Sequence, residues 1–362
     1  MPFSRLIFVT ATAANVRQGS GTYVGIATLR RALVALGHEV DLVAPPRMAA
    51  AAWRRLWFNL GLRRTLRLPR QGALVGFDLD GIFLAPRGLR NVAAIKGVVA
   101  EELRFERGLV RASLWLQARL EGWRVRRADL VIATSGYAAA AIARHYGVAR
   151  GRIGVVPELM DLAAWAELLA AAPPQARPRP RLLCVAHLYP RKDVATLLRA
   201  LARMQSRPEA HIVGVGPELR RLRRLARELG LDHRVRFLGH IGRAELAREY
   251  RNADLFCLPS RQEGFGIVLL EAMAAGLAVV AARAAAIPEV VPEGECGLLF
   301  PPGDVAALAA TLDQAFAEPG LRQRLGAAGA RHVLRYDAPR VARQFLAALE
   351  PEAAPTPWRS TP

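Results

Sequence analysis

Lysine is almost absent from this 362-residue chain: only Lys96 and Lys192 occur, so arginine supplies nearly all of the positive charge. Together with the high alanine content, this looks like a GC-rich coding bias, which weakens a functional reading of the net charge of +20. No nucleic-acid-binding module is recognisable either, so we expect no nucleic-acid partner.

Cysteine is also scarce, and long hydrophobic runs are missing. Cys184, Cys257 and Cys296 lie far apart, two of them in apolar runs, which is typical of buried, reduced thiols rather than a disulfide or zinc framework. No uninterrupted apolar run reaches about 18 residues, so we predict no transmembrane helix. The N-terminal residues resemble a first strand and lack a signal-peptide cleavage site. We therefore expect a cytoplasmic protein.

The positive charge is unevenly distributed. Residues 47–127 carry many more basic than acidic residues, and within them residues 51–67 mix Trp53, Trp57 and Phe58 with five arginines. Aromatic residues interleaved with arginine suit a helix lying at an anionic membrane surface. The alternative is an ordinary amphipathic helix packed through its aromatic residues. Composition leaves both interpretations open.

The first half of the chain alternates strand and helix patterns. A strand, a loop containing Gly19, Gly21 and Gly25, a helix and a second strand form a βαβ opening. The glycine spacing differs from that of a dinucleotide-binding fingerprint. The strands predicted in this half are 6–10, 40–44, 91–95, 128–134 and 152–157, with helices over 23–36 and 136–146, the latter capped by Ser135.

The second half repeats the alternation after a proline-rich stretch. Residues 171–181 contain four prolines, which exclude a helix or a central strand and predict a linker. Strands are predicted at 182–186, 210–215, 235–238, 254–258 and 277–281, with helices between them. This pattern indicates an α/β fold of two doubly wound parallel sheets facing a central cleft. The predicted organisation is an N-terminal Rossmann-like domain (1–170), a linker (171–181), a C-terminal Rossmann-like domain (182–335), a helix returning to the first domain (336–350) and a disordered tail (351–362).

The segment PSRQEGFGIVLLEAMAAG, residues 259–276, is the most informative part of the sequence. It follows a buried strand and places Glu263 on a loop and Glu271 inside a helix that begins near Ile267 and ends at Gly276. On one helix the two carboxylates would be roughly 12 Å apart, too far for a retaining glycosidase pair at about 5 Å. They could instead bind the two ends of an elongated ligand such as a sugar nucleotide. The alternative is that both are ordinary solvated charges.

At this point the second half resembles a known family, the retaining glycosyltransferases of family 4, which have the GT-B fold. The matching segments are VAHLYPRKDVATLLRAL (185–201), IVGVGPELRRL (212–222), VRFLGHI (235–241), ADLFCLPSRQEGFGIVLLEAMAAGLAVVAA (253–282) and IPEVVPEGECGLLFPPGD (287–304), in the family's order. The first half matches more loosely, through the glycine-rich loop, LRRALVALGHEV and ADLVIATS.

The resemblance implies that the N-terminal domain binds the acceptor and that the C-terminal domain binds the nucleotide sugar, and it implies roles for several of the matching residues. Glu263 would bind hydroxyls of the donor hexose, and Lys192 would stabilise charge on the leaving diphosphate. Both are therefore candidate catalytic residues. The other implied donor-binding residues are Gly19 and Gly21 in the first lobe, Ile241 beside the nucleobase, Phe265, Gly266 and Ile267 at the helix start, and Glu271 on the ribose.

Two departures from the family pattern matter. Where the family has Gly-Arg before the lysine, this chain has Ala186-His187, so His187 remains a candidate contact and charge compensation shifts to Arg191. Where many relatives have His-Gly in the N-terminal lobe, this chain has Lys96-Gly97. Lys96 is therefore a candidate residue of the acceptor lobe, against the default of a solvated surface lysine.

The resemblance implies transfer of a hexose, with retention, from a UDP-, GDP- or ADP-sugar. The expected acceptor is a glycan or lipid-linked intermediate of cell-envelope or exopolysaccharide synthesis, met at the inner membrane face. No cofactor is expected, and we expect no metal requirement because Asp78-Leu-Asp80, which has metal-binding spacing, lies in the acceptor lobe. The alternatives are a GT-B phosphorylase, a sugar-nucleotide epimerase, or a non-catalytic basic binding protein.

Overall fold

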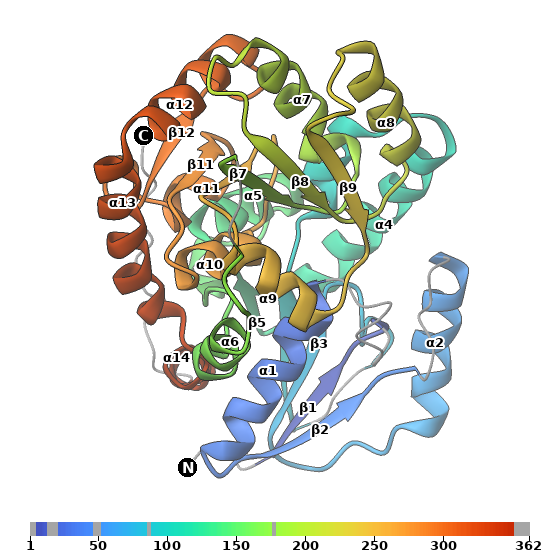
Figure 1. The fold of residues 1–362 in the computed structure, drawn as a ribbon. Helices are drawn as coiled ribbons and strands as arrows, with labels where there is room; N and C mark the ends of the chain where they lie inside the picture. The colour runs from blue at the N-terminus through green and yellow to red at the C-terminus, as the bar shows by residue number, and fades with distance from the viewer. Residues whose placement is uncertain (1–4, 13–20, 46–51, 85–87, 176–178, 351–362) are drawn as a thin grey trace. The chain divides into compact units, whose positions relative to one another are not determined.

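The computed structural model describes residues 5–12, 21–45, 52–84, 88–175 and 179–350. The chain divides into two compact units, and each is described by itself. Unit 1 comprises Met1–Met160 and Tyr336–Pro362, and unit 2 comprises Asp161–Arg335 (Figure 1). Gly19 and the tail 351–362 lie outside the described residues.

Unit 1 is built on a six-stranded parallel sheet in the order β2-β1-β3-β4-β5-β6. Its strands are β1 (Arg5–Val9), β2 (Glu39–Val43), β3 (Ala73–Phe77), β4 (Arg90–Ile95), β5 (Leu130–Ala133) and β6 (Ile153–Val155). Its helices are α1 (Gly21–Ala35), α2 (Ala52–Thr65), α3 (Val99–Glu102), α4 (Gly108–Arg127), α5 (Gly136–Tyr146) and α14 (Ala338–Ala348), with 3-10 turns η1 (Leu103–Phe105) and η2 (Arg150–Arg152).

Strands β1, β3 and β5 of unit 1 are almost wholly buried because helices cover both faces of the sheet, whereas the edge strand β2 is partly exposed. On one face, α1 and α14 pack over the sheet, and the ring of Phe8 lies 5.1 Å from that of Phe77 and 6.0 Å from that of Phe345. On the other face, Val131 packs with Ile142 of α5. Ser135 caps α5 as predicted, accepting a hydrogen bond from the backbone N–H of Ala138.

Unit 2 has a second six-stranded parallel sheet, in the order β12-β11-β10-β7-β8-β9. Its strands are β7 (Arg181–Val185), β8 (Glu209–Val213), β9 (Val235–Gly239), β10 (Leu255–Leu258), β11 (Val279–Ala282) and β12 (Gly297–Phe300). Its helices are α6 (Leu162–Ala170), α7 (Val194–Arg203), α8 (Leu219–Glu228), α9 (Arg243–Arg251), α10 (Ile267–Ala274), α11 (Ile287–Val290), α12 (Val305–Ala317) and α13 (Pro319–His332), with 3-10 turns η3 (Pro190–Lys192) and η4 (Val333–Tyr336).

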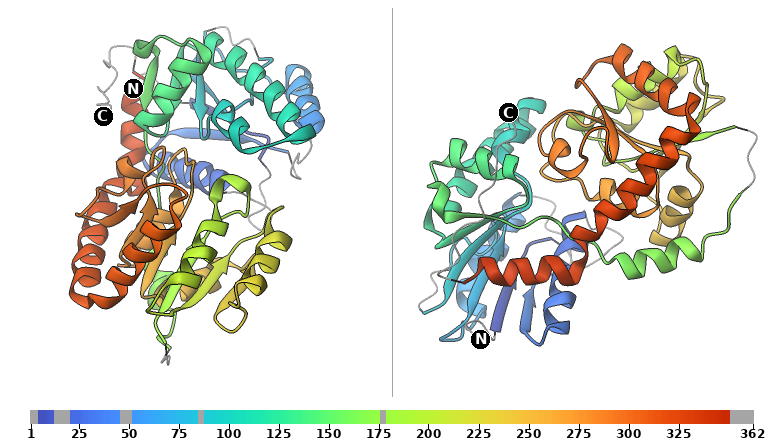
Figure 2. Two further views of the ribbon diagram at one scale, coloured as in Figure 1. Left: turned by 90° about the horizontal axis from the view of Figure 1, so that it is seen from above. Right: turned by 90° about the vertical axis from the view of Figure 1, so that its left-hand side faces the viewer.

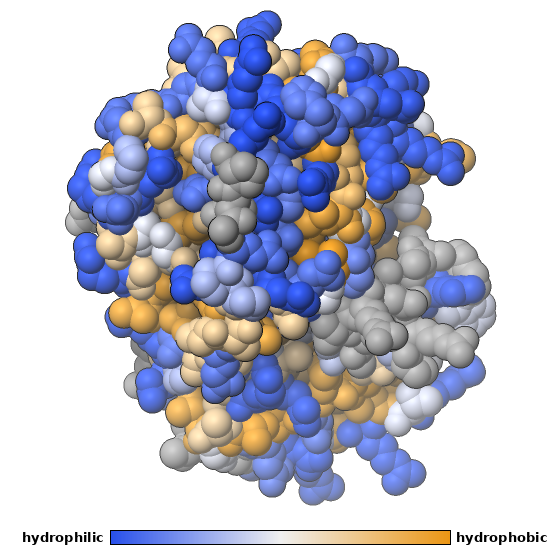
Figure 3. Space-filling view, viewed as in Figure 1, coloured by the Kyte–Doolittle hydropathy of each residue, from blue (hydrophilic) through white to orange (hydrophobic). Residues whose placement is uncertain are grey.

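Helices lie on both faces of this second sheet as well (Figure 2). On one side α7 packs against α8 and α12, and on the other α10 packs against α6 and α13. The outer surface is polar where α8 lies, because five of its ten residues are arginines; its place at the upper right of Figure 3 is strongly hydrophilic. The prediction of two doubly wound parallel sheets is therefore confirmed.

Several details differ from the sequence-based expectations. The division between the units lies before α6, whereas the predicted boundary lay after it, at residue 170. The reason is that Trp165 of α6 is fully buried in unit 2, where its indole N–H donates to the carbonyl of Glu271 at 3.2 Å. Strands β3 and β12 were not predicted. The three cysteines are buried and unbonded, as expected.

None of the described helices combines the length and hydropathy needed to cross a bilayer.

Candidate active site

Lys192 and Glu263 meet at the carboxyl ends of two neighbouring strands. Lys192 ends the turn η3 that follows β7, and Glu263 lies on the loop between β10 and α10. The Lys192 ammonium is 2.5 Å from Glu263 Oε1, and both side chains are largely buried, with 12% and 8% exposed. Burial alone would raise the pKa of Glu263, but the charges on Lys192 and Arg191 hold it below the usual value. Glu263 is therefore a carboxylate at neutral pH.

The position of this pair in the sheet is informative. β7 and β10 are adjacent, and from them the chain winds outward in opposite directions, to β8 and β9 on one side and β11 and β12 on the other. In open α/β sheets this switch point leaves a crevice outside the strand ends, where ligands bind. The paired lysine and glutamate therefore lie where the topology of unit 2 favours a ligand.

The start of α10 adds a second anion-favouring feature. The helix begins at Ile267, as predicted, directly after Phe265 and Gly266, and no side chain caps its first turn. Gly266 has φ 97°, and a Cβ there would come 2.9 Å from Leu269, so glycine is required. The N-terminus of a helix carries partial positive charge. It therefore favours a phosphate or carboxylate beside Glu263.

Glu271 is not the solvated helix residue of the alternative interpretation. Its side chain is buried within α10, and burial raises the pKa of its carboxyl, opposed by Arg243 and Tyr250. The Tyr250 hydroxyl donates to Glu271 Oε2 at 3.1 Å, and Arg243 Nη1 lies 4.0 Å from Oε1. Neither partner is predicted from the sequence. Their signal was GRAELAREY, a helix directly after the matched segment VRFLGHI.

The loops after β7 and β8 pass very close to each other. A Cβ on Gly214 would meet the carbonyl oxygen of Ala186 at 1.9 Å, and one on Gly216 would meet that of Leu188 at 2.5 Å. Only glycine permits this approach. Both glycines lie in the segment IVGVGPELRRL, for which the family resemblance implies no individual roles. Their contacts fix the loop that carries His187.

Arg191, rather than His187, contributes positive charge to this loop. His187 follows β7 with its ring partly open to solvent. Loss of water around the imidazole, together with Lys192 and Arg191, lowers the pKa of His187. The ring is therefore neutral at neutral pH, and Arg191 and Lys192 carry the positive charge. Ile241, the expected nucleobase neighbour, is half-buried just before α9.

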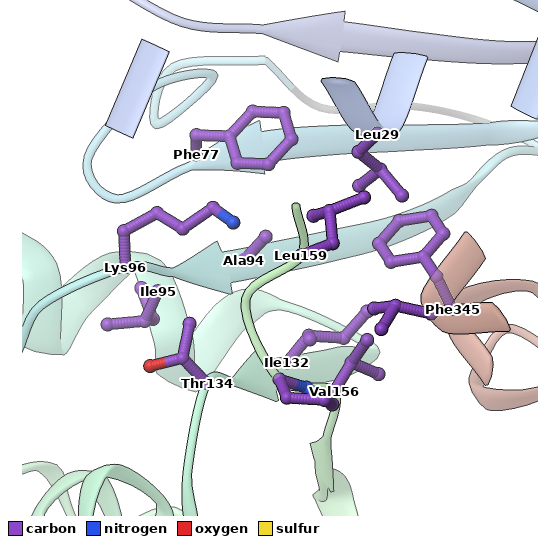
Figure 4. Close-up of a pocket in the computed structure, with 12 residues that line it drawn as sticks. Leu29, Phe77, Ala94, Ile95, Lys96, Ile132, Thr134, Val156, Leu159 and Phe345 are labelled. Atoms are coloured by element: carbon purple, nitrogen blue, oxygen red, sulfur yellow. The ribbon is translucent and has the colours of Figure 1, made fainter. Parts of the chain in front are cut away.

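Lys96 occupies a different environment, in unit 1. It follows β4, and its ammonium donates to Glu158 Oε2 at 2.8 Å, with only 10% and 5% of the two side chains exposed. Figure 4 shows Lys96 reaching between Phe77 and Leu159 into a small cavity. That cavity measures about 20 Å³, room for about one water molecule rather than a sugar. Lys96 is thus not a solvated surface lysine.

The Asp78-Leu-Asp80 sequence is engaged by protein groups. Asp80 is fully buried and accepts hydrogen bonds from the Ala11 N–H at 2.5 Å, Arg55 Nε at 3.0 Å and Asn59 Nδ2 at 2.9 Å. Asp78 accepts from the Lys96 N–H at 2.9 Å. Among the described residues no cluster of three or more His, Cys, Asp or Glu could hold a metal ion. The aspartates therefore tie β3 to α2 and to the end of β1.

Comparison with known proteins decides the family. The family model described as "Glycosyltransferase Family 4" matches residues 19–164, and "Glycosyl transferases group 1" matches residues 169–332. The chain belongs to glycosyltransferase family 4. Of the two candidate glycines Gly19 and Gly21, the structure describes Gly21, which is the first residue of α1 and lies within the first match.

Two curated relatives are more than a third identical to this family 4 chain over the parts that align. A D-inositol 3-phosphate glycosyltransferase of Streptomyces avermitilis is 35% identical over 58% of this chain and 48% of its own length. A phosphatidyl-myo-inositol mannosyltransferase of Mycobacterium leprae is 44% identical over 44% and 43%. The chain thus spans about half the length of these relatives.

Solved structures share the fold over nearly the whole chain. Sucrose-phosphate synthase from Thermosynechococcus elongatus superposes with a TM-score of 0.79 at 22% identity, covering 94% of this chain and 97% of that one. WaaG, a glycosyltransferase involved in lipopolysaccharide biosynthesis, gives 0.72 at 19% identity, covering 96% and 100%. At such identities the likeness concerns the fold alone.

Proposed function

We propose that this family 4 protein transfers a hexose from a nucleotide sugar with retention at the anomeric carbon. The observation that carries the proposal is the Lys192–Glu263 ion pair at the switch point of unit 2, directly before the start of α10. It combines a fixed positive charge, an ionised carboxylate and a helix N-terminus. The positive charge and the helix N-terminus suit the two phosphates of a sugar diphosphate, and the carboxylate can accept hydrogen bonds from the sugar hydroxyls.

The donor would lie along the carboxyl edge of the second sheet. Its diphosphate would meet Lys192, Arg191 and the backbone at Phe265 to Ile267, with His187 as a neutral neighbour. Glu263 would accept hydrogen bonds from the hexose. Farther along, Glu271 would bind the ribose while Tyr250 and Arg243 hold its carboxyl in place, and Ile241 would lie near the base. Gly19 and Gly21 would let the first lobe approach the donor closely.

The chemistry follows from these charges. As the bond between the anomeric carbon and the diphosphate oxygen breaks, negative charge grows on the leaving group, and Lys192 stabilises it. The acceptor hydroxyl forms the new C–O bond on the face that the diphosphate leaves, which retains the configuration. A departing phosphate oxygen takes the hydroxyl proton. Because fixed cations neutralise the diphosphate, we propose that transfer needs no metal, so EDTA should leave turnover unchanged.

We further propose that the acceptor is a glycan or lipid-linked intermediate of cell-envelope or exopolysaccharide synthesis, met at an anionic membrane surface. The support comes from relatives with such names: the mannosyltransferase of Mycobacterium leprae is described as acting on phosphatidyl-myo-inositol, and WaaG is described as involved in lipopolysaccharide biosynthesis. Lys96 remains a candidate contact in the acceptor lobe, provided that its ion pair with Glu158 opens.

The decisive experiment measures donor turnover with a panel of UDP-, GDP- and ADP-sugars. Glu263→Ala and Lys192→Ala should each lower kcat by about 10²–10³, the range seen when one fixed charge or donor is removed from a transition state. Glu245→Ala, an exposed carboxylate on α9, is the matched control. Unchanged turnover in both site variants would overturn the assignment. A product formed only when orthophosphate is added would instead identify a phosphorylase.

A further inference from the structure

Large apolar side chains are exposed mainly on two helices of unit 1. Among the described residues, eight of the twelve exposed large hydrophobic side chains lie on α2 and α4, and Leu109 is 90% and Trp57 67% exposed. We call this surface the α2–α4 face. Its members are Leu56, Trp57, Leu60, Leu109, Val110, Trp115, Leu116 and Trp123. Clustering of this kind marks a binding surface rather than scattered exposure.

The charge of the α2–α4 face has one sign. α2 contains no acidic residue, and the one acid of α4, Glu121, is fully buried. Arg119 lies 5.7 Å from the Trp115 ring and Arg127 lies 4.6 Å from the Trp123 ring. The exposed basic residues of the two helices are Arg54, Arg63, Arg64, Arg111, Arg119, Arg126 and Arg127. Tryptophan beside arginine suits the boundary between headgroups and acyl chains.

A cavity opens between the two helices. Its volume is about 490 Å³, within the range of about 300–1,000 Å³ typical of small-molecule sites. Leu56 and Leu116, 40% and 53% exposed, form its rim on the α2–α4 face. Apolar side chains make up most of the wall, and the polar groups are uncharged except for Arg55. The lining residues are Arg55, Leu56, Asn59, Leu79, Ile82, Ser113, Leu116, Gln117 and Leu120.

The polar end of this cavity is held rigidly. Arg55 and Asn59 both donate to the buried carboxylate of Asp80, and Asn59 Oδ1 accepts from the Gly81 N–H at 2.7 Å. Because these groups are satisfied within the protein, they do not compete for a polar ligand. An apolar ligand therefore suits the cavity better than a sugar.

We propose that the α2–α4 face docks on an anionic bilayer and that its cavity receives one hydrocarbon chain of a bilayer lipid. Charge decides between this occupant and a second copy of the chain. A two-fold dimer would bring the arginine-rich face against itself, whereas an anionic surface neutralises it. The inference deepens the proposed function, resting on it only for the idea that the acceptor is met at a membrane.

The first test is vesicle sedimentation, made without a nucleotide sugar. The protein should bind vesicles of phosphatidylcholine mixed with phosphatidylglycerol at least about tenfold more strongly than phosphatidylcholine alone. The double variant Trp57→Ser/Trp115→Ser should lose about tenfold in binding. The control is Val215→Ser/Leu334→Ser, which removes exposed apolar side chains from unit 2. Equal binding by both double variants, or no dependence on phosphatidylglycerol, would overturn the docking surface.

The second test addresses the cavity by calorimetry with lysophosphatidylglycerol below its micelle concentration. One molecule should bind per chain, and the headgroup alone, glycerophosphoglycerol, should not. Gln117→Phe, which fills the cavity, should weaken binding about tenfold while leaving vesicle docking intact; Gln314→Phe, exposed on α12, is the matched control. Equal affinity for lipid and headgroup, or no effect of Gln117→Phe in a protein with unchanged circular dichroism, would overturn the chain site.

Self-association is the remaining outcome. Light scattering that shows a dimer abolished by Trp57→Ser, with no vesicle binding, would assign the face to a second copy and overturn the proposal. None of these measurements involves the donor, so loss of glycosyl transfer and loss of lipid binding can be told apart.

Discussion

The chain's only two lysines form the same contact in different surroundings. Lys96 in unit 1 and Lys192 in unit 2 each follow a strand of a parallel sheet and each pair with a glutamate, at 2.8 Å and 2.5 Å. Around Lys96 are Phe77, aliphatic side chains and a cavity about the size of one water. Around Lys192 are Arg191, His187 and a switch point beside a helix N-terminus.

The difference shows that surroundings, rather than the ion pair itself, decide what a buried charge can do. The cavity beside the pair in unit 1 has room for about one water, so the closed pair joins β4 to the segment after β6. The pair in unit 2 lies where a second anion would be attracted by Arg191 and the start of α10. Lys192 can therefore exchange Glu263 for a phosphate without leaving the carboxylate uncompensated. This contrast can be tested by breaking each pair in turn.

The largest expected effect is on turnover. Lys192→Met should lower kcat by about 10²–10³ because the leaving group loses its fixed charge. Lys192→Arg should recover part of the rate, since it restores the charge but not the compact ammonium. Stability should fall less than in the corresponding Lys96 variant because Arg191 still faces Glu263. The measurements are steady-state kinetics and urea unfolding; equal rates for the methionine and arginine variants would refute a role for charge.

Next in size is the stability of unit 1. Lys96→Met leaves the buried Glu158 carboxylate, 5% exposed, without its cation, which should cost about 3 kcal/mol of unfolding free energy. The double variant Lys96→Met/Glu158→Gln should recover most of that loss because no charge is then left unpaired. Urea unfolding measures both. A single variant as stable as the original protein would show that the pair is not structural.

The third prediction concerns pH and the buried carboxyl of Glu121 in α4. Burial raises the pKa of Glu121 from 4.5 to about 8, although hydrogen bonds from Tyr146 and the Val99 N–H oppose the shift. Between these values the folded protein holds a proton that the unfolded chain releases. The contribution of Glu121 to the free energy of unfolding is therefore complete at a pH below the pKa that it has in the unfolded chain. This contribution falls by up to about 1.4 kcal/mol per pH unit as the pH rises toward 8.

Glu121→Gln should remove that slope, so the variant should gain stability relative to the original protein as pH rises through the interval. The pKa of Glu263 in unit 2 is shifted in the opposite direction, below its usual value. Glu263 therefore stabilises the folded protein at a pH above its pKa in the unfolded chain, and this stabilisation is lost as the pH falls through its pKa in the folded protein. Urea unfolding at several pH values separates the two. Parallel stability curves for Glu121→Gln and the original protein would contradict the assignment.

Much of the fold followed from sequence because apolar strands and amphipathic helices differ in period. The segments that escaped were short. β3 reads Ala73-Leu-Val-Gly-Phe77, and its glycine is required because a Cβ at Gly76 would meet the carbonyl oxygen of Asp80 at 2.0 Å. In β12 the glycine at 297 opens the strand. Glycine lowers the strand signal in a short run while serving close packing that only the folded chain reveals.

The sequence predicts the site residues that directly follow strands. It does not predict the side chains that contact them from other helices. Glu263 and Lys192 lie on loops that follow predicted strands, so their proximity could be expected from a parallel sheet. Tyr250 and Arg243 reach Glu271 from a separate helix, and Trp165 reaches it from α6. No local pattern encodes such contacts. The burial of Glu271 can therefore be recognised only from the tertiary structure.

The smallest expected effect is on a third ion pair, this one exposed to solvent. Arg5 and Asp41 join the neighbouring strands β1 and β2 at 2.8 Å, with 47% and 50% of their side chains exposed. Asp41→Asn should change the unfolding free energy by less than about 1 kcal/mol because water screens both charges whether or not they pair. Urea unfolding in low and high salt provides the measurement, and added salt should shrink the effect further. A loss as large as that of Lys96→Met would mean that pairing itself, rather than burial, sets the cost of a broken ion pair in this protein.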